Sequence, residues 1–573
     1  MSALVRDSRL REASQGDAGA AAGAVCVGNA HFLDADLASL STAQGQAAAW
    51  TAAFARFGTA APLHVRGDFA VAVRDNAGRT LLAVDRFAIR TLCYQVARNE
   101  LRYAERADEL CGDVPELDPQ AVFDYLYFHV IPAPRTVFRN VHRLPAGHCA
   151  LFEGGKLAVM PWWTPVFDED RPQPFASLRE EFRSLLRLAV AEHADRGRVG
   201  CFLSGGTDSS TVTGMLGLVT GKSPPTFSIG FDAEGYDEMA YARIAARHFN
   251  ADHHEYYVTP DDVVRSIPDI AAACDQPFGN SSVVPAYFCA KMAKEAGIDT
   301  MLAGDGGDEL FGGNTRYARQ RVLSIYGSVP ALIRARLVEP ALLGHTGLSR
   351  IPGLRKAQSY VDQARLPMPD RLQTYNLLTR IGATDVLTPE FLSSVDPEQP
   401  LREQRAAYSA STAQTLVNRM LAYDWKYTLA DNDLRKVVTA TSLAGVAPAF
   451  PLLDDRLVDF SLRLESSLKL KGLALRWFFK KALRGFLPEP IIAKRKHGFG
   501  LPFGVWMTRD AKLKALALDS FETLRDRGIV RPDFLDRLAG DFLPQFPGYY
   551  GEMVWILMML AQWEATMPRR VHR

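Results

Sequence analysis

A glycine-rich turn between an apolar strand and a helix is the feature that most constrains how this chain can fold. Residues 199–202 read as a short buried strand, Ser204-Gly205-Gly206 form the turn, and a helix is expected from near Ser209. Two glycines let a ligand approach the backbone closely, because no side chain stands in the way. The N–H groups and the dipole of the new helix favour an anion at the same place.

The side chains around this turn suit a phosphate chain bound together with a cation. Ser204, Ser209 and Ser210 supply hydroxyl donors, whereas Asp208 would repel a bare phosphate. An aspartate belongs here only if a divalent cation lies between it and the phosphate. No Gly-Lys-Ser/Thr follows, so the segment is not a Walker loop. The alternative is an ordinary strand–turn–helix corner with a serine cap, and the rest of the chain argues against it.

A second glycine-rich loop carries two more carboxylates. The apolar residues 301–303 lead into a loop in which Asp305 and Asp308 are separated and flanked by glycines. Carboxylates at this spacing, with glycines between them, suit cation binding and close approach of the backbone. The alternative, an exposed Gly-Asp turn, conflicts with the apolar residues on both sides.

Strands and helices alternate through the middle of the chain. Further strands are expected at 226–231 and 252–258, with a helix before each. This alternation predicts a parallel, doubly wound sheet. Ligands of such sheets bind beyond the carboxyl ends of the strands where the strand order reverses, and the first glycine-rich turn would lie there. The apolar run from Val554 to Trp563 is too short to span a bilayer and predicts a buried helix.

The first part of the chain has a different pattern. Residues 69–73 and 80–84 are apolar runs on either side of a turn at 75–78, which predicts a β-hairpin. Residues 164–178 are rich in Asp, Glu and Pro and read as a linker. The expected domains are therefore 1–163 and 179–573, joined by that linker.

The composition excludes several classes of protein. The chain has 573 residues, 47% apolar residues and a net charge of +1, which is typical of a globular protein with more than one domain. Without a basic field, neither a nucleic-acid partner nor an anionic membrane is expected. Seven scattered cysteines without a CxxC pair indicate a reducing compartment. The first residues lack the apolar core of a signal peptide, so we expect a cytoplasmic protein.

These motifs together resemble the asparagine synthetase family. The segment 204–210 is similar to the Ser-Gly-Gly-x-Asp-Ser-Ser pyrophosphate loop of asparagine synthetases and ATP-pyrophosphatases. Segments 66–73 and 144–148 resemble the family's N-terminal glutaminase domain, and 494–502 resembles the surroundings of its catalytic lysine. The resemblance implies an α/β fold: a remnant Ntn-type glutaminase-like sandwich, then a doubly wound ATP-pyrophosphatase (synthetase) domain with a helical C-terminal part.

The resemblance also implies roles for individual residues. Asp208 and Asp308 match the family's Mg²⁺ ligands, and Lys496 matches its catalytic lysine. Asp305 stands where asparagine synthetases carry an acidic residue and is expected to act as general base towards the amine. Asp424 is a further candidate catalytic partner. The expected ATP-binding residues are Leu203, Ser204, Gly205, Gly206, Asp208, Ser209, Ser210, Ile229, Gly230 and Gly304.

Two departures from the family pattern bear on the function. The family's glutaminase uses an N-terminal cysteine, whereas residue 2 is Ser, a much poorer nucleophile than a thiolate at neutral pH. Cys26 would become N-terminal only after cleavage, and we expect it to be a buried apolar residue. Four charged family positions near Lys436 and Asp454 are uncharged, which argues against aspartate as the substrate. They are Val438, Thr439, Ala447 and Ala449.

The resemblance implies an AMP-forming ligase that uses ATP and Mg²⁺. It would adenylate a small-molecule or peptide carboxylate and transfer it to an amine or ammonia, without glutaminase activity of its own. Lasso-peptide cyclases and β-lactam synthetases also lack the cysteine, so a ring-forming reaction stays open, as does a homodimer or a partner biosynthetic protein. Asparagine synthesis from aspartate, with ammonia from solution or a partner glutaminase, is a second alternative. A non-catalytic scaffold is a third, against which the retained loop, both aspartates and Lys496 argue.

Overall fold

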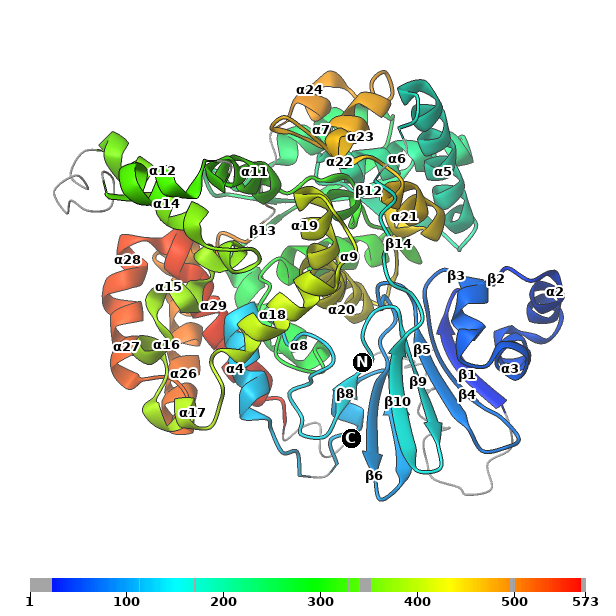
Figure 1. Cartoon of the computed structure of the whole chain (residues 1–573), viewed down its shortest axis with the longest axis horizontal. Helices are drawn as coiled ribbons and strands as arrows, with labels where there is room; N and C mark the ends of the chain where they lie inside the picture. The colour runs from blue at the N-terminus through cyan, green and yellow to red at the C-terminus, as the bar shows by residue number, and fades with distance from the viewer. Residues whose placement is uncertain are drawn as a thin grey trace.

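The computed structural model of this chain shows an N-terminal β-sheet part, a central parallel sheet flanked by helices, and a helical C-terminal part (Figure 1). The α/β fold predicted from the sequence is confirmed. The structure describes residues 23–112, 114–169, 172–327, 329–340, 352–494, 498 and 500–567.

The N-terminal part is built on a five-stranded antiparallel sheet. Asp75 N–H donates to the Arg79 carbonyl oxygen at 3.0 Å in the turn that joins its second and third strands, and these strands pair from Ala70↔Val84 to Arg74↔Thr80. The predicted hairpin is therefore confirmed. In spatial order the strands are β1 (Gly23–Gly28), β4 (Phe69–Arg74), β5 (Thr80–Val84), β9 (His148–Glu153) and β10 (Lys156–Pro161).

Both faces of the inner strands β4 and β5 are buried. Successive side chains of a strand point to opposite sides, so each strand contributes to two cores. Phe69 and Val71 pack against Trp50 of a helix on one face. Ala70 and Ala72 pack on the other face against a second, three-stranded sheet. This arrangement agrees with the expected sandwich. The helix is α3 (Gln46–Phe57), and the second sheet consists of β7 (Glu100–Ala104), β6 (Cys93–Ala97) and β8 (His142–Arg143).

The central sheet has five strands, and all neighbouring strands are parallel. β11, the first strand of this sheet along the sequence, lies in the middle of the sheet. The following strands are added first on one side of β11 and then on the other, so the strand order reverses between β11 and β14. A doubly wound sheet was predicted, and it is confirmed. In spatial order the strands are β13 (Asp252–Val258), β12 (Pro225–Phe231), β11 (Val199–Phe202), β14 (Thr300–Leu302) and β15 (Ala447–Ala449).

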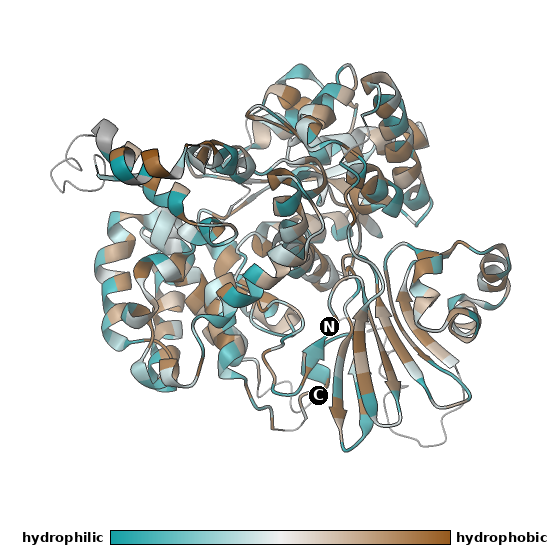
Figure 2. Cartoon of the chain, viewed as in Figure 1, coloured by the Kyte–Doolittle hydropathy of each residue, from teal (hydrophilic) through white to brown (hydrophobic). Residues whose placement is uncertain are grey.

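Helices cover both faces of this sheet. On one face, Phe182 and Met215 pack against Cys201, and the helix carrying Phe182 contains both hydrophilic and hydrophobic residues (Figure 2). On the other face, Ile267 and Val283 belong to the same core cluster as strand β12. The first pair of helices is α5 (Phe175–Ala194) and α6 (Thr207–Thr220), and the second pair is α8 (Pro260–Ala273) and α9 (Val283–Glu295).

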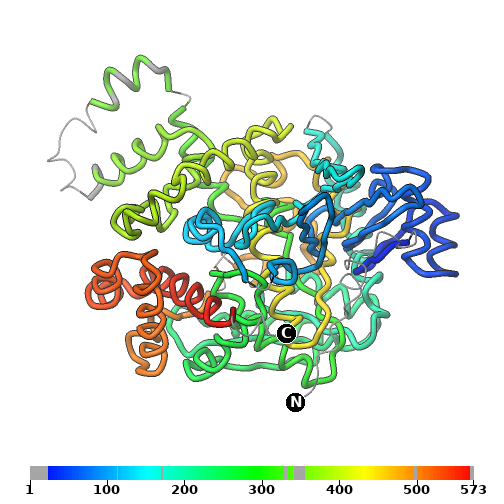
Figure 3. Tube along the Cα trace, turned by 90° about the horizontal axis from the view of Figure 1, so that it is seen from below, coloured from blue at the N-terminus to red at the C-terminus, as the bar shows by residue number. Residues whose placement is uncertain are grey.

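The C-terminal part is helical, and its last helix is almost wholly buried. Helix α29 (Pro547–Glu564) contains the apolar run from Val554 and packs on α25 (Phe503–Met507), α26 (Ala511–Arg527) and α8. The expected buried helix is confirmed. Within the described ranges, none of the helices has both the length and the apolar character needed to cross a bilayer. Figure 3 shows α12 (Ala331–Ile333) and α14 (Pro352–Arg365) projecting from the body.

Candidate active site

The first glycine-rich turn follows β11, as the sequence predicts, but its helix starts two residues earlier than expected, at Thr207. Gly205 has φ +65°, and a Cβ there would lie 2.4 Å from the backbone of Tyr241 and Ala242. No other residue type fits this position without a shift of the backbone. The Ser204 and Ser209 hydroxyl oxygens are 3.1 Å apart and close the turn.

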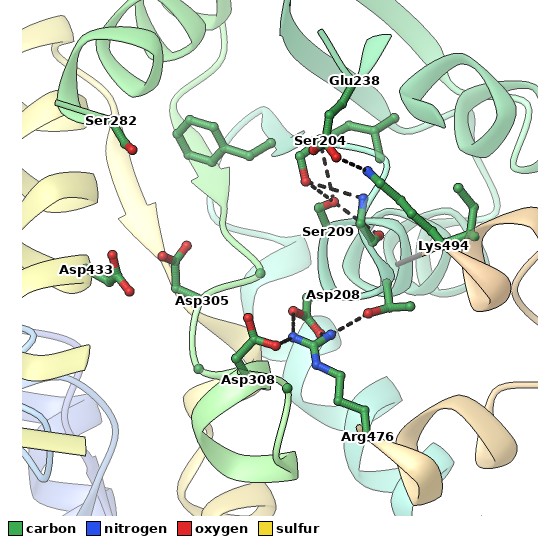
Figure 4. A pocket seen from close by; sticks show the side chains of 18 of the residues that line it. Ser204, Asp208, Ser209, Glu238, Ser282, Asp305, Asp308, Asp433, Arg476 and Lys494 are labelled. Atoms are coloured by element: carbon green, nitrogen blue, oxygen red, sulfur yellow. Dashed lines mark hydrogen bonds and ion pairs between the residues drawn. The ribbon is translucent and has the colours of Figure 1, made fainter. Parts of the chain in front are cut away.

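The second glycine-rich loop follows β14 and lies directly against the first. A Cβ on Gly304 would lie 2.8 Å from the Ser209 amide nitrogen, and one on Gly307 would lie 2.4 Å from a carboxylate oxygen of Asp208. The glycines are therefore needed so that the two loops can approach. This contact brings Asp208 and Asp308 together although they come from different strand–helix junctions (Figure 4).

The two loops line a cavity of about 750 Å³ at the carboxyl ends of β11 and β14. Ser210 is among the predicted ATP-binding residues that do not line it, and its buried hydroxyl has no hydrogen-bond partner among the described residues. A Cβ on Gly230 would meet the Tyr257 ring, and Gly205 contacts α7 (Met239–His248) instead of the cavity. The predicted residues that do line it are Leu203, Ser204, Gly206, Asp208, Ser209, Ile229, Gly304, Asp305 and Asp308.

Arg476 is a cavity residue that sequence reasoning did not single out. Its buried guanidinium forms ion pairs with both Asp208 and Asp308, including a 2.6 Å hydrogen bond to Asp208 (Figure 4). Burial acts to lower the pKa of Arg476, but the two aspartates outweigh burial and raise it. The signal available in the sequence was its place in the Leu475-Arg-Trp segment, which resembles the family.

Two lysines add positive charge on the same side of the cavity. Lys494 Nζ lies 2.9 Å from Glu238 Oε1 and 3.4 Å from the Gly205 carbonyl oxygen. Burial, and then the charge of Arg476, lower the pKa of Lys480, which also lines the cavity. Lys496, the predicted catalytic lysine, lies outside the described residues, so its role stays a prediction.

Asp305 lines the cavity and forms part of an ion-paired group. Lys436 Nζ lies 3.3 Å from Asp305 Oδ1 and 3.2 Å from Asp433 Oδ1. Burial raises the pKa of the neighbouring Glu309 well above its usual value, and Asp308 and Asp433 raise it further. The ion pairs at this end of the cavity are those between Lys436 and the two aspartates, Asp305 and Asp433.

Asp424 does not belong to the site, and its predicted catalytic role is wrong. It is 0% exposed and does not line the cavity. Its carboxylate is bonded to Arg316 and to the Tyr317 hydroxyl. A fully buried carboxylate whose hydrogen-bonding capacity is taken up by its neighbours has no access to a substrate, so Asp424 forms a structural ion pair with Arg316.

The positions at which this chain lacks family charges also lie away from the cavity. Neither Val438, Thr439, Ala447 nor Ala449 lines it, whereas Lys436 and Val437 do. The uncharged side chains at these positions therefore do not alter the cavity lining, and they no longer argue against aspartate as the substrate. Asp275 also does not line the cavity and is bonded to Arg143 at 2.6 Å.

Asp208 and Asp308 fit a Mg²⁺ ion only in combination with a phosphate ligand. Among the described residues no group of three or more His, Cys, Asp or Glu could hold a metal. Mg²⁺ commonly binds proteins through one or two carboxylates and takes its other ligands from phosphates and water. The two aspartates therefore fit such an ion once Arg476 releases them.

Comparison with known proteins identifies the family. Residues 181–565 match the model of the asparagine synthase family, and residues 38–163 match that of the glutamine amidotransferase domain. Asparagine synthetase 1 of Bacillus subtilis, named as glutamine-hydrolysing, is 25% identical over 458 residues, which are 78% of this chain and 69% of that protein. Asparagine synthetase 3 of the same organism is 21% identical over 455 residues, 76% and 67% of the two chains. This chain belongs to the asparagine synthase family and is a carbon–nitrogen ligase of that type.

Proposed function

We propose that this chain is an AMP-forming, ATP-dependent amide ligase that adenylates a carboxylate and transfers the acyl group to an amine, without hydrolysing glutamine itself. The observation that supports this most directly is the meeting of the two glycine-rich loops. It brings Ser204, Ser209, Asp208 and Asp308 to one cavity at the switch point of the sheet.

In this proposal the side chains on the Ser204 side hold the phosphates. The serine hydroxyls and the N-terminus of α6 would bind the outer phosphates, and Asp208 with Asp308 would hold Mg²⁺. The ion would supply charge stabilisation to the departing pyrophosphate. Arg476 would move from the aspartates to the phosphate oxygens, and Lys480 would add a second positive charge. Ile229 lines the cavity where it would contact the nucleoside.

The amide-forming half-reaction belongs to the other end of the cavity. Asp305 would accept a proton from the amine before it attacks the acyl carbon. Lys496 remains the expected partner of the negative charge that develops on phosphorus and then on the acyl oxygen. Together these roles give AMP, pyrophosphate and an amide as products.

The test is formation of AMP and pyrophosphate from ATP and Mg²⁺ in the presence of a fractionated mixture of cellular carboxylates. The adenylated carboxylate is identified by mass spectrometry. Asp208→Ala removes one of the two metal carboxylates and is expected to abolish AMP formation. Asp232→Asn, at a residue that does not line the cavity, serves as the control. Equal AMP formation by Asp208→Ala and the unchanged chain would contradict the proposal.

The absence of glutaminase activity is supported by the position of Cys26. This residue is the fourth of strand β1, pairs with Val71, and packs partly buried against the α3 face of the sheet. It lies within a strand and not at a free chain start. We expect the pure protein to release no glutamate from glutamine, and measurable release would overturn this part of the proposal.

A second candidate is asparagine synthesis from aspartate and free ammonia. It is favoured by the names of the two relatives and by the finding that the uncharged family positions lie off the cavity. Incubation with ATP, Mg²⁺, aspartate and ammonium chloride distinguishes it, since asparagine would then accumulate. A ring-forming reaction on a peptide or small molecule stays a prediction.

A further inference from the structure

A second pocket, of about 480 Å³, lies between α11 (Thr315–Gly327) and α14. The two helices lie beside α12 at one edge of the molecule (Figure 1) and enclose a small core of their own. This pocket, called the arm pocket below, shares no lining residue with the active-site cavity. It is lined by three basic side chains, Arg319, Arg355 and Lys356, and among the described residues that line it none is a carboxylate.

The positive charge of the arm pocket is not balanced by neighbouring carboxylates. Residues 315–361 contain eight arginine or lysine residues and one acidic residue, Glu339, whereas the whole chain has a net charge of only +1. Glu339 lies 3.6 Å from the Arg365 guanidinium and is therefore already engaged. Within the described residues, none of the ion pairs includes a basic side chain of the arm pocket. Three cations around one pocket favour an anionic ligand.

Arg319 is held in position by uncharged neighbours. Its guanidinium carbon lies 4.3 Å from the centre of the Tyr375 ring, and its Nη2 donates to Gln363 Oε1 at 3.0 Å. The Tyr375 hydroxyl donates to the same oxygen at 2.9 Å. A cation positioned by neutral groups keeps its full charge for a ligand and loses little side-chain entropy when the ligand binds.

Apolar side chains are exposed on the same group of helices. Ile325 lies one helical turn beyond Val322 on α11, and Leu332 and Leu337 lie on α12 and η3 (Arg334–Val338). A ligand with both carboxylates and apolar groups would bury this surface while its carboxylates pair with the basic side chains. An acidic peptide segment has both features, whereas inorganic phosphate has only the charge.

Helix α11 connects the arm pocket with the active-site cavity. Thr315, its first residue, lines the cavity, whereas Arg319 and Val322 line the arm pocket. Residues at positions i, i+4 and i+7 share one face of an α-helix, and seven residues advance the helix by about 10 Å. An extended peptide covers that distance with about three residues. One peptide can therefore reach both places.

We propose that the arm pocket binds a carboxylate-bearing segment of a peptide substrate whose reacting group lies in the active-site cavity, about three or more residues away. The pocket is concave and can enclose a carboxylate side chain, whereas the surface of a lipid bilayer would contact a flat or convex face. This inference rests on the ligase function proposed above and names the substrate class, which is an acidic, partly apolar peptide.

Isothermal titration of the full chain with two matched peptides tests the binding. The probe is acetyl-DLEDLE-amide, and the comparison is acetyl-NLQNLQ-amide, which keeps the shape and the apolar groups but lacks the charges. We expect the uncharged peptide to bind at least about tenfold more weakly, and sodium chloride to weaken binding of the acidic one. Equal binding of the two peptides would overturn the inference. So would equal displacement of the acidic peptide by the same concentration of inorganic phosphate.

Two double variants complete the binding test. Arg355→Gln with Lys356→Gln removes two of the three cations and is expected to weaken binding of the acidic peptide at least about tenfold. Arg509→Gln with Lys514→Gln changes the same residue types at exposed positions outside the arm pocket and should leave binding unchanged. Circular dichroism confirms that each variant is folded. Unchanged binding by the folded arm-pocket variant, or equal loss in both variants, would contradict the assignment.

Co-sedimentation with phosphatidylserine vesicles tests the membrane alternative. The full chain is expected to stay in the supernatant. Sedimentation that depends on Arg355 and Lys356, without binding of the acidic peptide, would assign the arm pocket to a membrane surface and overturn the inference.

The two proposals can fail separately. If AMP forms and needs Asp208 while peptide binding ignores Arg355 and Lys356, the ligase function stands and the arm-pocket site falls. If peptide binding needs both cations while no AMP forms with any carboxylate fraction, the binding site stands and the ligase function falls. If both hold, the arm-pocket variant should raise KM for the identified substrate and leave kcat unchanged. An adenylated carboxylate no larger than a single amino acid would overturn the substrate class.

Discussion

The guanidinium of Arg476 lies where the carboxylates of Asp208 and Asp308 converge. Without a cation at this point, the two partly buried like charges would repel each other at close range. A metal ion brought in with phosphates would take over this task, and Arg476 could then pair with the phosphates. One side chain would thus serve both the empty and the loaded site.

Arg476→Met tests this interpretation. Removing one partner of a buried ion pair leaves uncompensated charge, so we expect the free energy of unfolding to fall by about 3 kcal/mol in EDTA. Mg²⁺ without nucleotide should restore part of this loss, because the ion replaces the missing positive charge. Thermal unfolding with and without Mg²⁺ measures both effects.

The unchanged protein is the control for that experiment, since its two aspartates are already paired and Mg²⁺ alone should shift its unfolding temperature little. The interpretation would be contradicted if Arg476→Met were as stable as the unchanged chain in EDTA. It would also be contradicted if Mg²⁺ shifted both proteins equally.

The sequence predicted the site residues that lie in local motifs, but not those whose role depends on contacts with distant parts of the chain. Ser204, Asp208 and Asp308 lie in short motifs whose glycines dictate local backbone geometry, so their placement followed from sequence. Arg476 pairs with Asp208 across 268 residues of chain, and nothing local encodes that contact. Asp424 was assigned from its neighbourhood in the sequence, which does not reveal that its carboxylate is buried.

At the scale of elements, the site depends on two strand–turn–helix units whose turns touch. Gly205 adopts a positive φ, and the backbone of α7 lies against the space that a Cβ would fill. Gly221, at the other end of α6, has nearly the same φ of +66° but open space around it. The two glycines flank the same helix and have nearly the same φ, so they differ mainly in the space around the Cα atom.

Gly205→Ala and Gly221→Ala should separate conformational strain from steric clash. A left-handed conformation costs a non-glycine residue roughly 1–2 kcal/mol, and both variants incur this cost. Only Gly205→Ala also clashes with backbone atoms at 2.4 Å, so it alone should lose ATP binding. Urea unfolding and isothermal titration with ATP measure the two effects. Equal loss of ATP binding in both variants would contradict this reading.

At the scale of the whole molecule, Asp275 joins the N-terminal sheets to the central part. It pairs with Arg143 of β8 and accepts a hydrogen bond from the Ala107 amide at 3.1 Å. Burial acts to raise the pKa of Asp275, but Arg143 and Arg106 outweigh it and lower the pKa below its usual 3.8. The contact between the two parts therefore includes a partly buried, ionised carboxylate.

Asp275→Asn should reduce the free energy of unfolding by about 3–5 kcal/mol at pH 7, because the buried Arg143 loses its ion-pair partner. A carboxylate with a lowered pKa in the fold contributes its full stability above the unfolded-state pKa of about 3.8 and loses it as pH falls further. The difference between the two proteins should therefore be constant from pH 5 to 7 and shrink below about pH 4. Urea unfolding across this range checks it, with exposed Asp519→Asn as control. A difference that grows towards low pH would contradict the assignment.

The sequence predicted the strands, helices and their arrangement in a parallel sheet better than it predicted the ion pairs between distant segments. Alternating strands and helices predict the parallel sheet, and the apolar runs 69–73 and 80–84 predict the hairpin, because these signals are periodic and local. The ion pairs between the N-terminal sheets and the central part depend on which surfaces of the two parts come into contact. The hydrophobic periodicity of the sequence carries no information on that contact. The expected linker, 164–178, already includes the first residues of α5.

The lining of the large cavity is drawn from residues spread between Phe202 and Lys494. It includes the loops that follow β11 and β14, Lys436 and Val437 of α20 (Leu434–Ala444), and Arg476 with Lys480 from a later segment. A polypeptide growing on the ribosome consequently lacks part of this cavity until residue 494 has been synthesised. Under the proposed ligase function, translation products that end before Lys494 would therefore not turn over ATP.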